Sequence, residues 1–372
     1  MSRTLGKIVS VGAITLLILS TNEAFAQDGD TYVIRGATIH TVSSAPVENG
    51  TIILRGGRIV AIGQNLDIPS GAQTIDGTGK HVYPGMIDAF SQLGLTEIGS
   101  VAATNDATEM GRFNPHLNAH TAIHPASEHI PVARANGITH TLAAPGGSGS
   151  GITGQATLIH LDGWTVEEME IEKSAAMVMT WPSLATRGGR FGGFGGGGGR
   201  RSFDEVKRRF DEQVEEMDGW LVAAQHYKQA MDAGSTRLGR DLQLENLTRV
   251  LDRGMKVIIR ANGHREIESA IEFAEKWNLD IVIAGASGAR KVIDLLAEKS
   301  VAVILGPVQR LPSNQDDPYD DPNTLPGLLA DAGVEIAFAT FGSSDSRTLP
   351  YEAANSVSWG LAKDDAFEAI TL

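Results

Sequence analysis

The sequence predicts an α/β protein in which a (β/α)8 barrel follows a small all-β module. From Pro84 onward, short apolar runs alternate with segments of helical periodicity, which is typical of a parallel barrel. Before Pro84, β-rich runs follow one another closely. The 372 residues are 42% hydrophobic and include no cysteine. An apolar core must therefore hold the fold without disulfides.

Residues 1–26 have the pattern of a secretory signal peptide. Two basic residues precede an apolar run, Ile8–Leu19, that is too short to span a bilayer. Ala24-Phe25-Ala26 fits the small-x-small pattern of a cleavage site, so the mature chain is expected to begin at Gln27. We expect an exported protein of the periplasm or cell envelope, with no stable membrane span after signal cleavage. An uncleaved membrane anchor is the alternative.

The charge balance argues against a nucleic-acid partner. The chain has 31 basic and 45 acidic residues, a formal net charge of -14. An acidic surface repels phosphate backbones, and no basic stripe interrupts it outside the Gly/Arg-rich segment 187–201.

Residues 27–83 are predicted to form a β-sandwich module that serves as a scaffold. Gly56 and Gly57 separate two β-rich runs and predict a tight hairpin. The β-rich runs are Tyr32–Ile39, Gly50–Leu54, Ile59–Ile62, Gln73–Asp76 and His81–Tyr83.

Residues 84–372 are predicted to form the barrel. The expected strands are Met86–Ile87, Thr139–Ala143, Ala175–Met179, Val257–Ile259, Asp280–Ala284, Val301–Leu305 and Val334–Ala339. The expected outer helices are Ser202–Ala233, Glu266–Trp277 and Lys291–Lys299. The segment 187–201 is predicted to be a mobile surface loop, since it lacks the Gly-Lys-Ser/Thr of a phosphate-binding loop. Gly146–Gly151 is predicted to be a tight loop at the barrel mouth.

Two motifs carry a resemblance to a known family. Gly56–Gly63, followed by Asp76–Ala89, resembles the amidohydrolase superfamily, especially its imidazolonepropionase-like members. The resemblance continues through Asn136–Thr139 to Leu349–Ala354. It implies a metal-bearing barrel flanked by a β-sandwich, with hydrolysis of non-peptide C–N bonds as the typical activity. That chemistry uses a divalent metal, such as zinc, to activate water at the strand ends.

The sequence departs from the family at the metal-ligand positions. The family's first strand ends Asp-Ala-His-x-His, whereas this chain reads Asp88-Ala89-Phe90-Ser91-Gln92. Two later histidine positions are taken by Arg260 and Gly285, and the last strand has Thr340 and Phe341 where the family has an aspartate. Phenylalanine and arginine cannot act as metal ligands. We therefore expect no metal cofactor and a degenerate catalytic centre.

A polar pocket is expected to remain at the barrel mouth, formed by Gln92, Arg260, Asn262, His264 and Asp345. Arg260 is suited to bind a carboxylate through two parallel hydrogen bonds. In the alternative interpretation, Arg260 pairs with Asp345 or another acid and only fills the volume that the metals would occupy. These two interpretations stay open at this point.

Two functions follow from this pattern. The first is a binding protein, or the non-catalytic partner of an active homologous amidohydrolase subunit, with a carboxylate-bearing small molecule as ligand. The alternative is an active hydrolase of cyclic amides or N-acyl compounds. It would use an atypical metal site, with zinc as the candidate ion, or a metal-free route through Arg260, His264 and Asp345.

Two other groups of residues are weaker candidates for a metal site or a catalytic site. His116, His120, His124 and His129 have partly helical spacing, but prolines interrupt the segment and favour surface histidines in a loop. Serine nucleophiles at Ser148, Ser150 or Ser343 lack a strand-to-helix elbow. The family also continues beyond a segment like Ala366–Leu372 with strands of the sandwich, so half of that sandwich is expected to be missing. The module would then expose sheet edges, which predicts poor stability or a dimer that covers them. The alternative is that the sequence is a truncated fragment.

Overall fold

The computed structural model describes residues 31–147, 149–186, 202–234, 239–313 and 317–372. The expected signal peptide, the Gly/Arg-rich segment 187–201 and Ser148 lie outside the described residues. The chain divides into two compact units, and the boundary falls between Tyr83 and Pro84.

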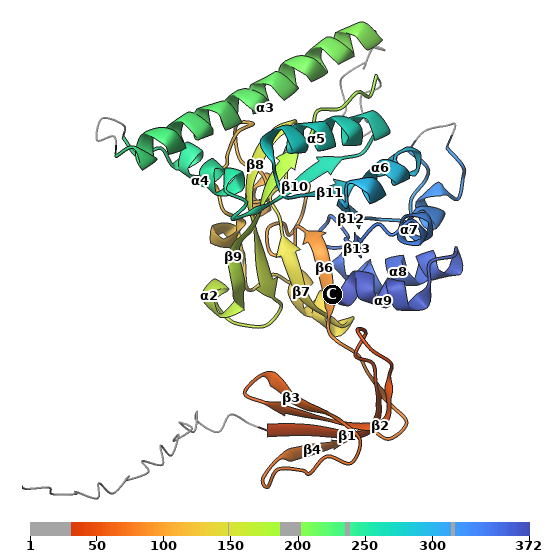
Figure 1. Ribbon diagram of the computed structural model, residues 1–372. Helices are drawn as coiled ribbons and strands as arrows, with labels where there is room; N and C mark the ends of the chain where they lie inside the picture. Colours follow the sequence, from red (N-terminus) through yellow and green to blue (C-terminus); the bar gives the residue numbers. More distant parts are fainter. Residues whose placement is uncertain (1–30, 148, 187–201, 235–238, 314–316) are drawn as a thin grey trace, which may run out of the picture. The chain divides into compact units, whose positions relative to one another are not determined.

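The first unit contains one five-stranded sheet (Figure 1). Its order is β3-β2-β1-β4, and β5 pairs with β1. Gly56 and Gly57 form the two-residue β2–β3 turn with φ values of 54° and 74°, which confirms the predicted hairpin. The module is all-β as predicted, and its described residues form a single sheet and not two packed layers. The strands are β1 (Thr31–Ile39), β2 (Val47–Arg55), β3 (Arg58–Gly63), β4 (Gln73–Asp76) and β5 (His81–Val82).

The second unit is an eight-stranded barrel in the order β13-β12-β11-β10-β9-β8-β7-β6. Its strands are β6 (Met86–Ser91), β7 (Ile138–Ala143), β8 (Gly151–His160), β9 (Glu170–Thr180), β10 (Lys256–Ala261), β11 (Ile281–Gly285), β12 (Ala302–Leu305) and β13 (Ile336–Phe338). The seven predicted strands are confirmed. The eighth, β8, was not predicted, and it runs antiparallel between β7 and β9. Its glycine-rich start resembles a loop in sequence, which is why it was missed.

The barrel closes where the first strand meets the last. The backbone N–H of Phe341 donates to the carbonyl of Phe90 at 2.9 Å, and the N–H of Gln92 donates to the carbonyl of Gly342 at 3.1 Å. Asp88 accepts hydrogen bonds from both the backbone N–H and the hydroxyl of Thr340. This seam brings the ends of β6 and β13 together, although 252 residues separate Asp88 from Thr340.

The barrel interior is a distinct apolar cluster. It contains side chains from every strand or from the residue that follows it, which only the inside of a barrel allows. The buried members are Phe90, Ala144, Ala156, Ala176, Val178, Ile258, Ala284, Ile304 and Ala339. Successive side chains of a strand point to opposite faces. The neighbours Met177 and Val257 accordingly pack in the larger outer core.

Helices surround this barrel (Figure 1). All three predicted helices are confirmed, as α3, α5 and α6, and the long α3 packs along α4. Among the described residues, no helix is long and apolar enough to cross a bilayer. The helices are α1 (His129–Ala135), α2 (Val166–Met169), α3 (Phe203–Asp232), α4 (Leu242–Leu251), α5 (His264–Trp277), α6 (Ile293–Glu298), α7 (Asp321–Asp331), α8 (Leu349–Ser358) and α9 (Lys363–Thr371). Short 3₁₀ turns are η1 (Ala102–Thr104), η2 (Ala119–Ala122), η3 (Ala289–Lys291) and η4 (Ser346–Thr348).

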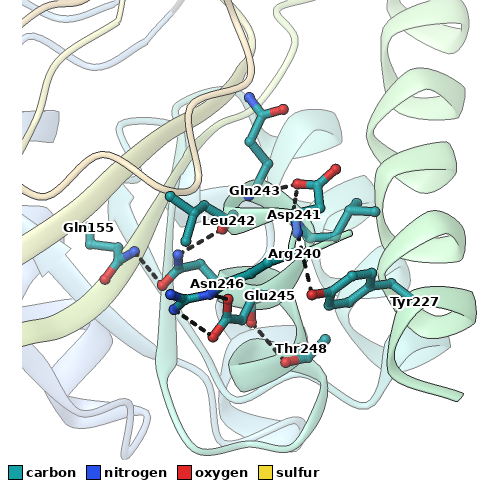
Figure 2. Close-up of polar contacts among 10 residues, drawn as sticks. Gln155, Tyr227, Arg240, Asp241, Leu242, Gln243, Glu245, Asn246 and Thr248 are labelled. Atoms are coloured by element: carbon teal, nitrogen blue, oxygen red, sulfur yellow. Dashed lines mark hydrogen bonds and ion pairs between the residues drawn. The ribbon is translucent and has the colours of Figure 1, made fainter. Parts of the chain in front are cut away.

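A polar network attaches α4 to the antiparallel strand β8 (Figure 2). Asp241 caps the helix by accepting from the N–H groups of Gln243 and Leu244. The buried Gln155 of β8 donates to the side chain of Asn246 at 2.9 Å and to the carbonyl of Pro115 at 2.8 Å. A buried amide on β8 therefore holds α4 against the barrel wall.

Candidate functional site

The residues at the expected metal positions lie at one end of the barrel. Strands β6, β10 and β11 belong to the parallel part of the sheet, so their carboxyl ends open on the same side. Phe90 lies on β6, Arg260 near the end of β10 and Gly285 at the end of β11. This end is the barrel mouth.

An aromatic pair fills the position where the family has its first histidine. Phe90 is only 1% exposed, and its ring stacks on that of Phe341 with the centroids 4.9 Å apart. Phe341 has φ of 57°, a left-handed conformation that a bulky residue rarely adopts. The hydrogen bond from the backbone N–H of Phe341 to the carbonyl of Phe90 holds this conformation. Strained backbone conformations of this kind cluster at binding and catalytic sites.

Arg260 lies over this aromatic pair. Its guanidinium carbon is 5.6 Å from the ring centroid of Phe90. Within the described part of the chain, no side chain or backbone group hydrogen-bonds or ion-pairs with the guanidinium. Burial lowers the pKa of Arg260, and no charged group among the described residues offsets this effect. The expected alternative of an Arg260–Asp345 ion pair is therefore not found.

Thr180, at the end of β9, is a site residue that the sequence analysis missed. It lies in register with Arg260 across the β9–β10 pair. Ala176 and Val178 face the barrel interior, so Thr180 shares their face. Its Oγ1 is buried and has no hydrogen-bond partner among the described residues. The alternation along β9 was the signal that could have identified it.

The other expected pocket residues are less closely tied to Arg260. Gln92 is half-buried, and its Nε2 would lie 2.9 Å from a Cβ added at Gly146. Gly146 lines a shallow surface hollow together with Arg112 and Thr153. Asn262 is exposed, and its Oδ1 lies over Gly285, where an added Cβ would come within 2.6 Å.

His264 and Asp345 are separate from the guanidinium. His264 is the first residue of α5, and Asp345 is exposed ahead of η4. Across the described ranges, no hydrogen bond or ion pair joins either side chain to Arg260. The structure therefore brings Phe90, Phe341, Arg260 and Thr180 together, and it shows no catalytic relay between Arg260, His264 and Asp345.

Glu266 organises the loops of the mouth. Its carboxylate is buried and accepts from the hydroxyl of Ser183 at 2.9 Å and from the N–H of Leu184 at 2.8 Å. It also accepts from the N–H groups of Gly263 and Asn262. These bonds join the chain after β9 to the chain after β10, the two strands that carry Thr180 and Arg260.

Two further buried carboxylates stabilise the mouth. Glu352 accepts from the N–H groups of Val308 at 2.6 Å and Gln309 at 3.2 Å, and so fixes the loop after β12. Burial raises the pKa of Glu352. At the seam, burial raises the pKa of Asp88 to about 7, against hydrogen bonds from Thr340 that lower it.

The histidine-rich segment does not form a metal centre in the described structure. His120 is buried in η2, which corrects the expectation of a surface position, and its Nε2 lies 2.6 Å from the carboxylate of Glu170. His129 begins α1, and its Nε2 donates to the backbone carbonyl of Glu97 at 2.9 Å. Over the described ranges, no group of three or more His, Cys, Asp or Glu side chains is arranged to hold a metal ion.

Comparisons with known proteins agree with this architecture. No protein-family model matches the chain. D-hydantoinase from Geobacillus stearothermophilus is 36% identical over 93 residues, which are 25% of this chain and 19% of that enzyme. Imidazolonepropionase from Staphylococcus aureus is 43% identical over 47 residues, 13% of this chain and 11% of that enzyme. The matched segments thus span less than a fifth of these curated relatives.

A solved structure extends the likeness over most of the chain. An amidohydrolase from Thermotoga maritima MSB8 superposes with a TM-score of 0.75 at 22% identity, covering 90% of this chain and 85% of that one. The barrel, with its mouth at the parallel strand ends, is a TIM-like barrel. The chain therefore shares its fold with this amidohydrolase.

Proposed function

We propose that this barrel binds a small carboxylate at its mouth and does not hold the metal centre of the amidohydrolases that it resembles. The observation that carries the proposal is Arg260, a half-buried guanidinium without a counter-ion among the described residues. A desolvated cation is costly unless it is paired. A planar guanidinium in this position matches the two oxygens of a carboxylate.

The side chains at the strand ends do not fit a divalent metal. The aromatic ring of Phe90 supplies no lone pair for coordination, Gly285 has no side chain, and the guanidinium of Arg260 is a permanent cation. A positive charge at this position repels a metal ion. The chain is thus proposed to act as a binding protein or as the non-catalytic partner of an active homologous subunit.

The competing function is an active hydrolase of cyclic amides or N-acyl compounds. It would need an atypical site for an ion such as zinc, or a metal-free route through Arg260, His264 and Asp345. The relatives carry the names D-hydantoinase and imidazolonepropionase, but they match only short segments of the chain. No contact among the described residues favours this function.

The proposed setting is the periplasm or cell envelope. Support comes from the signal-like residues 1–26 and from the absence of cysteine, which leaves no thiol to oxidise after export. The net charge of -14 favours a small-molecule or protein partner over nucleic acid.

Metal content and carboxylate binding test the proposal together. We expect the protein, purified without chelator, to contain no stoichiometric zinc, manganese or iron by elemental analysis. A double variant, Phe90→His with Gln92→His, controls for recovery of metal-binding capacity. Near-stoichiometric metal in the native protein, with turnover of a cyclic amide, would contradict the proposal and establish the competing function.

Calorimetric titration with carboxylates tests whether the barrel mouth binds a carboxylate. Arg260→Met retains the apolar stem of the side chain but removes the guanidinium, so binding should be lost. Arg265→Met is the matched control, because Arg265 is an exposed arginine of α5 whose guanidinium lies 5.9 Å from the ring of Phe203. Equal loss of binding in both variants would argue against a specific role for Arg260.

A further inference from the structure

Resting on the proposed function, we propose that the ligand is a monocarboxylate with an apolar, ring-containing body and no ammonium group. Its carboxylate is shared by Arg260 and the hydroxyl of Thr180, and its body lies against Phe341. Each of the three features of this ligand follows from a separate observation at the mouth.

The hydroxyl of Thr180 completes the carboxylate site. Arg260 and Thr180 are directly paired across parallel strands, and both face the barrel interior. The Oγ1 of Thr180 is buried without a hydrogen-bond partner among the described residues. Buried polar atoms normally have partners, and those without one mark a ligand position or a cost in stability. One carboxylate offers enough lone pairs for both donors.

The charge of the surroundings excludes an ammonium group. Burial is the only cause that shifts the pKa of Arg260, whereas the carboxylates of Asp317 and Asp321 act on the guanidinium of Arg310. Among the described residues, no carboxylate forms an ion pair or a hydrogen bond with the guanidinium of Arg260, whereas the buried Asp321 pairs with Arg290. The ammonium of an amino acid would stand beside the same guanidinium without a counter-ion, which disfavours zwitterions.

The aromatic pair defines the body of the ligand. Phe90 is covered by its neighbours, but Phe341 is only half-buried and packs against the edge of the barrel-interior cluster. Both Phe341 and Arg260 contact the ring of Phe90, so the apolar and charged surfaces adjoin. A ligand ring stacked on Phe341 would have its carboxylate directed to Arg260.

The decisive variant is Thr180→Val, which replaces a buried hydroxyl with a methyl group of similar shape. If Thr180 serves the ligand, this change should weaken binding of 3-phenylpropanoate about tenfold and at the same time raise Tm, because it removes an unpaired buried hydroxyl. A purely structural hydroxyl would not give these opposite signs. Thr180→Ser keeps the hydroxyl and is the matched control, and we expect its Kd to stay close to that of the native protein.

Three probes separate the features of the ligand by calorimetric titration. Propanoate lacks the ring of 3-phenylpropanoate, and phenylalanine adds an ammonium to it. We expect 3-phenylpropanoate to bind at least about tenfold more tightly than either. Phe341→Leu should reduce this preference for the ring while leaving the affinity for propanoate unchanged.

The outcomes distinguish this inference from the proposed function. If no probe binds to the native protein, the proposed function itself fails. If the probes bind and Arg260→Met abolishes binding, the carboxylate site stands. In that case, an unchanged Kd in Thr180→Val, or equal affinities for the three probes, overturns the present inference alone.

Discussion

Polar side chains occur at two places where strands of the barrel end, and their surroundings differ. At the seam between β6 and β13, Asp88 is fully buried and receives hydrogen bonds from Thr340 and from the N–H of Phe90. At the ends of β9 and β10, Arg260 and the Oγ1 of Thr180 have no partner among the described residues. The paired groups close the barrel, whereas the unpaired groups are available to a ligand.

The largest effect that would test this contrast is loss of binding in Arg260→Met. Removing a desolvated, hydrogen-bonding cation from a binding site typically costs about 2–4 kcal/mol, or roughly 100-fold in Kd. We expect this loss for 3-phenylpropanoate by calorimetric titration. The free energy of unfolding should not fall, because the guanidinium forms no hydrogen bond or ion pair with the described residues. A variant that binds normally but unfolds more easily would show that Arg260 stabilises the fold and does not bind the ligand.

The opposite result is expected at the seam. Asp88→Ala leaves the N–H and hydroxyl of Thr340 buried without an acceptor, so the free energy of unfolding should fall by about 3 kcal/mol. Urea denaturation of the variant and the native protein measures this difference. A loss below about 0.5 kcal/mol would show that the seam does not depend on the carboxyl group.

The seam should also make stability depend on pH. The pKa of Asp88 is raised from 3.8 to about 7 in the folded state, so its contribution is fully present below pH 3.8 and is lost as pH rises through 7. At 1.36 kcal/mol per pKa unit, the loss between pH 5 and pH 8 is about 2.6 kcal/mol. Asp88→Asn cannot titrate and should show a flatter stability profile over this range. Parallel profiles for the two proteins would contradict the raised pKa.

A smaller effect of the same sign is expected at Glu352. Burial raises its folded pKa above 4.5, so its contribution is present below that pH and is lost as pH rises through the folded pKa. Both backbone N–H groups donate to one oxygen, so the amide of Glu352→Gln can still accept them. Tm of this variant should therefore fall less than that of the native protein between pH 4 and pH 7. An identical fall would leave the carboxyl group without a role in the pH response.

Part of the barrel could be predicted because its elements carry local signals. The glycine pair at residues 56 and 57 predicts the β2–β3 turn, and the apolar periodicity of residues 202–233 predicts α3. Strand β8 has a start rich in glycine, and its antiparallel pairing with β7 and β9 depends on residues far away in the sequence. Local periodicity gave no sign of it.

The candidate site also combines residues that local sequence identifies with residues that only long-range contacts reveal. Arg260 was identified from its place in a motif, and its role as a binding residue stays a prediction; its guanidinium has no hydrogen-bond or ion-pair partner among the described residues. Thr180, Glu266 and Asp88 were missed as site or positioning residues, since each matters through a contact with another strand or loop. His264 and Asp345 were expected beside Arg260, but proximity to a strand end does not establish a side-chain contact.

By itself, the sequence determined the barrel class, the tight hairpin, the superfamily motifs and the loss of histidine at the expected ligand positions. These are properties of residue type and of short-range spacing, which the chain carries without folding. Only the tertiary structure decided which polar groups are satisfied. Asp88 pairs with Thr340 across 252 residues, whereas Arg260 and the hydroxyl of Thr180 adjoin with no hydrogen-bond partner among the described residues. The physical reason is that desolvation and hydrogen bonding depend on what surrounds a side chain in space.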